Sequence, residues 1–129
     1  MKKFALTLCL GAFALCVAAT PAMAILPFSK EWKAKYSDNS TNEAFVKAVK
    51  EANCNVCHDP GSKSKKDRNP YGMAVSKYLK KADYEKMKMD VEAAKKYILE
   101  GLDKAEADKA ADGKTFGERI KAGSLPAGA

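Results

Sequence analysis

The sequence predicts an all-α domain of about four helices. Apolar residues recur at helical spacing over residues 42–53, 70–81 and 91–108. A shorter stretch, 115–123, is bounded by helix start and stop signals. No segment shows the alternation of apolar and polar residues that is typical of a strand. We therefore expect helices alone to build the core.

The first two expected helices begin at capping residues. The segment Ser40-Thr41-Asn42-Glu43 fits a capping box, in which the serine and glutamate side chains satisfy each other's free backbone amides. It predicts a helix that leads to about Asn53. Asn69 followed by Pro70 places an N-cap residue before a proline at the first helical position, which predicts a second helix up to about Lys81.

Capping residues also precede the last two expected helices. Asp83 and Asp90 are N-cap candidates ahead of the longest helix, which we expect over residues 91–108. Thr115-Phe116-Gly117-Glu118 is a second capping box. It predicts a short final helix, which Pro126 prevents from continuing.

The N-terminal segment predicts export. Lys2 and Lys3 form a basic start, and the 16 residues from Phe4 to Ala19 are free of charge. Ala22-Met23-Ala24 then places small residues where a signal peptidase cleaves, so residues 1–24 are interpreted as a signal peptide. The apolar run is shorter than the roughly 20 residues of a membrane-spanning helix. We therefore expect a periplasmic or otherwise exported protein without a membrane span after cleavage.

The mature chain forms one domain of ordinary size in this interpretation. Residues 25–41 are expected to be an extended lead-in, whose Trp32 and Tyr36 cover a cofactor or the edge of the core. Residues 42–126 form the folded domain. Without Lys2 and Lys3 the 23 basic residues become 21 against 16 acidic ones, so the formal charge falls from +7 to +5. This excess favours acidic partners, and we expect no nucleic acid because an exported protein rarely meets any.

The chemistry of the chain is concentrated in Cys54-Asn55-Val56-Cys57-His58. This is C-x-x-C-H, the attachment signature of c-type haem. Two thiols at this spacing in a helical turn match the two vinyl groups of a haem, and the adjoining imidazole is then placed to bind the iron. We therefore expect Cys54 and Cys57 to form the covalent thioethers of one haem c, and His58 to be the proximal axial ligand.

Two other chemistries also use cysteines at this spacing. A zinc site needs about four ligands, but the mature chain offers only Cys54, Cys57 and His58 unless a carboxylate completes the set. A thiol–disulfide oxidoreductase uses C-x-x-C in a βαβ context, and no strand is expected here. Haem attachment is the preferred interpretation.

The frame around the motif resembles class I cytochrome c. A helix leads directly into C-x-x-C-H, and residues 42–126 match the family in outline, which implies a small bundle around one covalent haem. Pro70 lies twelve residues after His58, close to where the family often places a proline whose carbonyl orients the haem histidine. Ile120–Pro126 is similar to the I-x-x-G-x-x-M-P stretch of many small bacterial cytochromes, but Leu125 stands in the place of the distal methionine.

The second axial ligand of such a haem is left open by the sequence. His58 is the only histidine, so two histidines of one molecule cannot bind the iron. A methionine would raise the reduction potential, and the candidates are Met89, Met73 and Met87, for each of which core packing is the alternative. A vacant site, water or a lysine are the other possibilities.

We expect electron transfer rather than catalysis from a small exported haem protein. One alternative is a five-coordinate haem protein that binds a gas or acts as a weak peroxidase, although peroxidase chemistry usually needs a distal acid–base group. Another is a small subunit of a larger redox complex, with the region around Trp32 as a contact. A hydrolase is disfavoured because Ser-His and Cys-His pairs need a histidine, and the only one is assigned to iron.

A redox partner is expected to dock on basic residues near the haem. Lys63, Lys65, Lys66 and Arg68 lie close behind the motif in sequence. They predict a docking face for an acidic partner. A solvated loop without a partner explains the same residues equally well.

Overall fold

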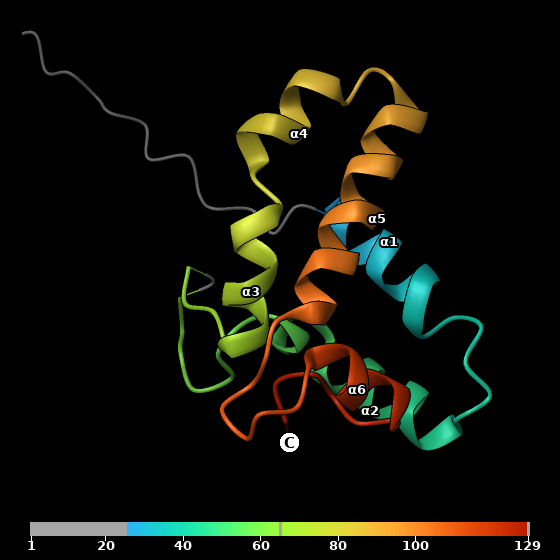
Figure 1. The fold of residues 1–129 in the computed structure, drawn as a ribbon, viewed down its shortest axis with the longest axis vertical. Coiled ribbons are helices and arrows are strands. Elements are labelled where there is room, and N and C mark those ends of the chain that lie inside the picture. Colours follow the sequence, from blue (N-terminus) through green and yellow to red (C-terminus); the bar gives the residue numbers. More distant parts are fainter. Residues whose placement is uncertain (1–25, 65, 129) are drawn as a thin grey trace, which may run out of the picture.

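The computed structural model describes residues 26–64 and 66–128 and confirms the all-α fold over this range (Figure 1). The expected signal peptide, residues 1–24, lies outside the described residues. The helices are α1 (Leu26–Tyr36), α2 (Glu43–Ala52), the short 3-10 helix η1 (Asn53–Val56), α3 (Pro70–Tyr78), α4 (Lys81–Met87), α5 (Val91–Ala107) and α6 (Phe116–Lys121). None of the described helices has the length and apolar character needed to cross a membrane.

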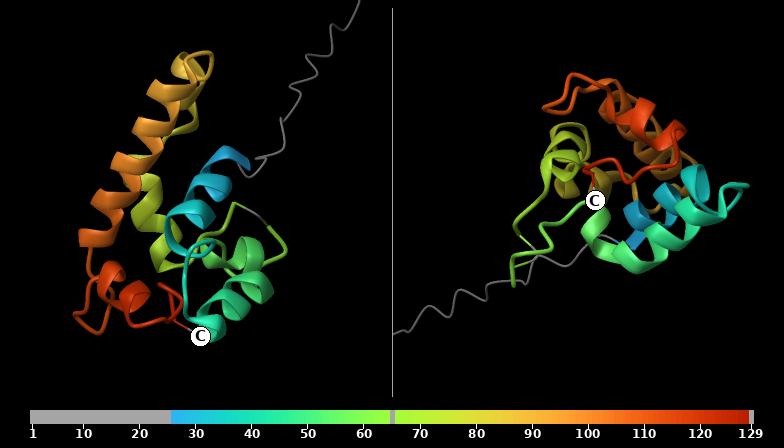
Figure 2. Two further views of the ribbon diagram at one scale, coloured as in Figure 1. Left: turned by 90° about the vertical axis from the view of Figure 1, so that its right-hand side faces the viewer. Right: turned by 90° about the horizontal axis from the view of Figure 1, so that it is seen from below.

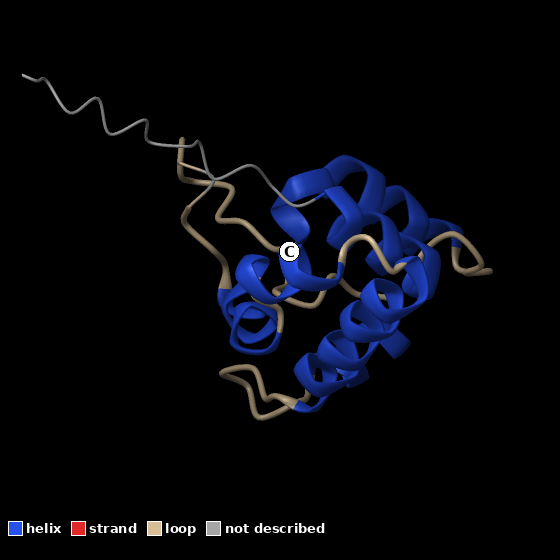
Figure 3. Cartoon of the chain, turned by 90° about the horizontal axis from the view of Figure 1, so that it is seen from above, coloured by secondary structure: helices blue, strands red, loops and turns tan. Residues whose placement is uncertain are grey.

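Helix α5 is the central element of the fold. Helices α1, α3, α4 and α6 all pack against it. Figure 1 shows α3 and α5 as the two sides of an arch that α4 closes at the top, with α2 and α6 at its base. Figure 2 shows α1 beside α5 from a second direction, and Figure 3 shows the joining loops along the outside. The core residues larger than alanine are Trp32, Phe45, Val49, Val56, Tyr71, Leu79, Ile98, Leu102, Phe116 and Ile120.

The expectation of an extended lead-in at residues 25–41 was wrong for most of its length. Residues 26–36 form α1, and Pro27 is tolerated because it lies in the first turn, where its missing amide costs nothing. Phe28, Trp32 and Tyr36 follow one another at every fourth residue, so they share one face of α1. This stripe is one residue wide and is flanked by charges, which is why the apolar pattern did not predict a helix.

The expected helix starts were mostly correct. The side chains of Asn69, Asp90 and Thr115 cap α3, α5 and α6, and Glu118 completes the predicted capping box of α6. The first capping box was wrong, because the N-cap of α2 is Asn42, whose side chain accepts from the amide of Phe45 at 3.0 Å.

The region after α3 also differs from the expectation. Helix α3 ends at Tyr78 and the chain turns into α4, within which Asp83 lies in the first turn and is not an N-cap. The hydroxyl of Tyr97 on α5 accepts from the amide of Lys80 at 2.7 Å. This contact satisfies the backbone at the break between the two helices, and it joins residues too far apart in sequence for local pattern to reveal.

Close packing of α3 on α5 depends on Gly101. A Cβ atom at this position would lie 2.2 Å from Cδ2 of the buried Leu79 and 2.6 Å from its Cγ. Glycine lowers helix propensity by about 1 kcal/mol relative to alanine. The glycine in this helix is therefore explained by the space that Leu79 occupies.

Gly101→Ala is expected to lower the free energy of unfolding by about 1–2 kcal/mol, because overpacking outweighs the gain in helix propensity. Urea unfolding followed by circular dichroism measures the change. Lys104→Ala, at an exposed position of the same helix, should stay within about 0.5 kcal/mol of the parent. A Gly101→Ala protein more stable than the parent would contradict the packing explanation.

Candidate functional site

The three residues of the C-x-x-C-H motif that carry its chemistry line one cavity. Its volume is about 370 Å³, and its walls come from α1, η1, α3 and α5. The apolar lining residues are Phe28, Trp32, Val56, Val75, Leu79 and Leu102. A larger groove of about 580 Å³ lies between α1 and the first half of α5, but it contains neither cysteine and not the histidine. The smaller cavity is therefore the candidate functional site.

The two thiols are presented by one tight turn of the chain. Asn53, the C-cap of α2, has φ 47° and ψ −113°, a backbone conformation that residues with a side chain rarely adopt. The amides of Cys57 and His58 then donate to the carbonyl of Cys54, at 3.2 and 3.1 Å. Both cysteines are free thiols, Cys54 exposed and Cys57 part-buried. Burial raises the pKa of the Cys57 thiol to about 12, so this thiol is protonated near neutral pH.

The imidazole of His58 is oriented by the returning loop. Its Nδ1 lies 3.2 Å from the carbonyl oxygen of Asp67. A carbonyl only accepts, so Nδ1 carries the proton and Nε2 presents its lone pair to a ligand. The resemblance implied this role for the carbonyl of Pro70. In the structure Pro70 begins α3, and the carbonyl of Asp67 takes the role instead.

The side chain of Asn69 forms hydrogen bonds with the backbone of the motif. Its Nδ2 donates to the carbonyls of Asn55 and Val56 at 2.9 and 3.0 Å, and it lies 3.4 Å from the carbonyl of His58. Its Oδ1 accepts from the amide of Gly72 at 2.8 Å, so one buried side chain joins the motif to the start of α3. The sequence predicted the capping role of Asn69 but not these contacts, which depend on residues more than ten positions away.

Gly72 allows the start of α3 to approach the backbone of the motif closely. A Cβ atom there would lie 1.8 Å from the carbonyl oxygen of Cys57. No side chain fits in that space, so the first turn of α3 rests directly on the backbone of the motif.

Helix α1 forms the wall opposite α3 and is held by polar contacts to the core. The indole Nε1 of Trp32 donates to the hydroxyl of the fully buried Tyr71 at 2.8 Å. Trp32 is itself buried and belongs to the hydrophobic core. Phe28 and Trp32 line the cavity, while Lys35 and Tyr36, at the C-terminal end of α1, bind side chains of α5.

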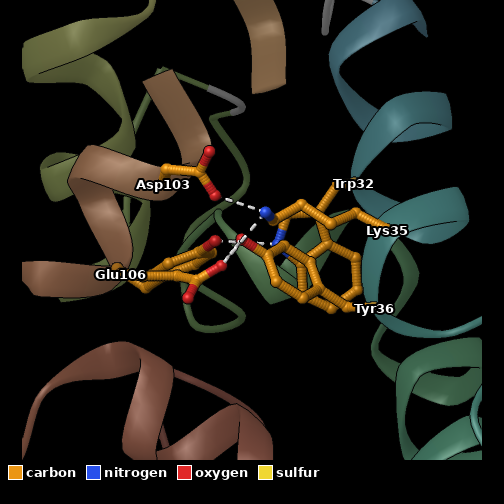
Figure 4. A network of polar contacts seen from close by, with 6 residues as sticks. Trp32, Lys35, Tyr36, Asp103 and Glu106 are labelled. Carbon is orange, nitrogen blue, oxygen red and sulfur yellow. Dashed lines mark hydrogen bonds and ion pairs between the residues drawn. The ribbon is translucent and has the colours of Figure 1, made fainter. Parts of the chain in front are cut away.

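The tie between α1 and α5 is a group of four side chains (Figure 4). Lys35 is paired with Asp103 and lies 3.5 Å from Glu106, and the hydroxyl of Tyr36 donates to Glu106. Burial, and then the bond to Glu106, raise the pKa of Tyr36 far above its usual range, so the phenol keeps its proton. These contacts fix the rotation of α1 and therefore the side chains that it presents to the cavity.

The methionines proposed as axial ligands do not line the cavity. Met73 is 59 % exposed on α3, and Met89 is 91 % exposed between α4 and α5. Met87 ends α4 and is also outside the lining. Leu125 packs against the core near the C-terminus, away from the motif. Sequence proximity to a loop did not bring any of these residues to the site.

Three cations line the cavity, two of which the sequence did not single out. They are Lys33 on α1, Arg68 before α3 and Lys81 at the start of α4. Of the basic residues expected to form a docking face, Lys63 and Lys66 are exposed on the loop, Arg68 reaches the cavity, and Lys65 lies outside the described residues. In the sequence, nothing distinguishes Lys33 and Lys81 from the other lysines that are spread along the chain.

Comparison with known proteins adds no identity to this site. No protein-family model, curated protein or solved structure matches the chain. Any function must therefore follow from the cavity and the chemistry of its residues.

Asn69→Asp is expected to lower the free energy of unfolding by at least about 2 kcal/mol. The carboxylate keeps the cap to Gly72 but cannot donate, so it places a negative charge against the carbonyls of the motif. The matched control is Asn42→Asp, at the exposed N-cap of α2, where a carboxylate caps as well as an amide and stability should change by less than about 0.5 kcal/mol. Equal effects of the two substitutions in urea unfolding would show that Asn69 only caps its helix.

Proposed function

We propose that the chain is an exported mono-haem c-type cytochrome that transfers electrons. The observation that carries the proposal is that the cysteines and the histidine of C-x-x-C-H line a cavity whose other walls are apolar and contain three cations. Export is supported by the signal-peptide pattern of residues 1–24, because covalent haem attachment takes place outside the bacterial inner membrane.

The residues of the cavity fit a haem in three respects. Two free thiols lie one helical turn apart, and His58 has its Nδ1 engaged and its Nε2 available. The walls are apolar, as the macrocycle requires. Among the described residues, the lining contains three cations and no carboxylate, which suits a cofactor with two negatively charged propionates. The volume also falls within the range of about 300–1,000 Å³ that is usual for cofactor sites.

The other interpretations of the cysteines receive less support. A thioredoxin-like enzyme places C-x-x-C in a βαβ unit, whereas the motif here joins two helices. A zinc site needs about four ligands, whereas the described lining of the cavity offers Cys54, Cys57 and His58 with no carboxylate beside them.

Each part of the site has a role in electron transfer. Haem, when bound, supplies an iron that takes up and releases one electron. His58 would hold the iron of a bound haem, and the carbonyl of Asp67 keeps the imidazole in one orientation and tautomer. The apolar walls exclude water and thereby tune the reduction potential. No residue needs to act as an acid, base or nucleophile.

A second candidate function is ligand binding at a five-coordinate iron. It is favoured by the positions of Met73, Met87 and Met89, none of which lines the cavity. In this case a gas or peroxide would occupy the sixth position. The spin state of the iron distinguishes the two functions.

The purified protein, expressed with a c-type haem attachment system, should carry one haem that survives acid–organic extraction. Mass spectrometry and visible spectra test this directly. Cys54→Ser and Cys57→Ser should each leave one thioether at most, and the double variant none. Complete two-bond attachment in the Cys57→Ser variant, or a wild-type protein without covalent haem, would refute the proposal. A low-spin ferric spectrum is expected for the electron carrier, and a high-spin spectrum that changes with carbon monoxide on reduction supports the second candidate.

The basic loop after the motif is proposed to guide an acidic redox partner. Lys63→Glu with Lys66→Glu should slow oxidation by the anion ferricyanide by about an order of magnitude at low ionic strength, because electrostatic steering is lost. The same double change should speed oxidation by tris(phenanthroline)cobalt(III), which is a cation.

The control for this prediction reverses the same number of charges at Lys104 and Lys121, which are exposed on α5 and at the end of α6. Stopped-flow rates should change much less in this variant. Equal slowing by both double variants would mean that total charge matters and that the loop forms no docking face.

A further inference from the structure

We propose that the amine of Lys33 is the second axial ligand of the haem iron. This inference rests on the proposed function, since it assigns a residue to a cofactor that the C-x-x-C-H motif would attach. It names the ligand from the residues that line the cavity, which the sequence could not do.

The lining offers few groups that bind iron strongly. A low-spin iron needs a nitrogen or sulfur ligand opposite the histidine. Apart from the motif, the described lining residues with such an atom or with a weaker oxygen donor are Ser29, Lys33, Asn53, Arg68, Ser76 and Lys81. Hydroxyls and amides are weak ligands for this iron, and an arginine stays protonated and has no free lone pair. Two lysine amines are left.

The two lysines differ in their exposure and in their place on the cavity wall. Lys81 is exposed at the first residue of α4, at the solvent side of the cavity. Lys33 is part-buried in the last turns of α1, on the wall that faces α3. Ser29, one helical turn before Lys33, and the adjacent Trp32 also line the cavity. Of the two lysines in the lining, Lys33 is the less exposed.

The pairing of charges supports the same choice. Lys35, two residues further on, is held by Asp103 and Glu106. Lys33 takes part in none of the ion pairs found among the described residues. The anchor at Lys35 and Tyr36 fixes the rotation of the helical turn that carries Lys33, which lines both this cavity and the neighbouring groove. Bonding of the amine lone pair to iron then releases one proton from the ammonium group to water.

Substitutions of Lys33 in the haem-loaded protein test the inference. Lys33→Arg keeps the charge but removes the ligand, so the low-spin ferric signal in electron paramagnetic resonance should be replaced by a high-spin signal, as it should in Lys33→Ala. Lys30→Ala, at an exposed position of the same helix that does not line the cavity, should keep the low-spin signal of the parent. Covalent haem content and helical circular dichroism are measured for every variant.

A measurement on the unsubstituted protein does not depend on variants that fold. Electron–nuclear double resonance of protein grown with isotopically labelled lysine side-chain nitrogen should show a labelled nitrogen bound to the iron. A low-spin signal retained in Lys33→Ala, or no labelled nitrogen at the iron, would overturn the ligand assignment while covalent haem upholds the proposed function. A wild-type protein with high-spin covalent haem also overturns the assignment, and a protein without covalent haem overturns both.

Discussion

The structure depends on the contact between the C-x-x-C-H turn and the first turn of α3. Backbone lies on backbone there, because Gly72 has no side chain and because Asn69 satisfies the carbonyls that the turn would otherwise leave without a donor. Buried carbonyls without partners are costly, so a single amide side chain makes the close approach possible. The position of the thiols, the orientation of His58 and the start of α3 all follow from it. The same contact sets α3 at the angle from which Leu79 packs on Gly101 of α5.

Local sequence signals were sufficient for much of the fold. Asn69, Asp90 and Thr115 were correctly predicted as N-caps because a capping side chain acts on amides only two or three residues away. The start of α2 was misassigned by two residues, since Ser40 and Asn42 are both good caps and only the path of the chain decides between them. Helix α1 was missed because its apolar stripe is one residue wide, and its stability comes from contacts to α3 and α5 that no local pattern contains.

The residues of the site also fall into those that the local sequence predicts and those that it does not. The motif residues were predictable because C-x-x-C-H confines its chemistry to five consecutive positions. The carbonyl that orients His58 was assigned to the wrong residue, because a loop rather than a helix passes behind the imidazole. The cavity wall was beyond prediction, since Lys33, Arg68 and Lys81 meet only when α1, the loop and α4 are folded together. The methionines, in contrast, lie near the motif or near a turn in sequence but do not line the cavity. Nearness in sequence does not determine which side of a helix a residue occupies.

The contacts that hold α1 also determine when the cavity can close. Lys35 and Tyr36 reach carboxylates that lie 68 and 70 residues further along the chain. Among the described helices α1 comes first in the chain, but its contacts to α5 cannot form until α5 has been synthesised and folded. Until then the cavity lacks one wall, and the thiols of Cys54 and Cys57 are more accessible than in the folded protein. The ion pair and the tyrosine hydrogen bond that anchor α1 thus also decide at which stage of folding the two thiols become enclosed.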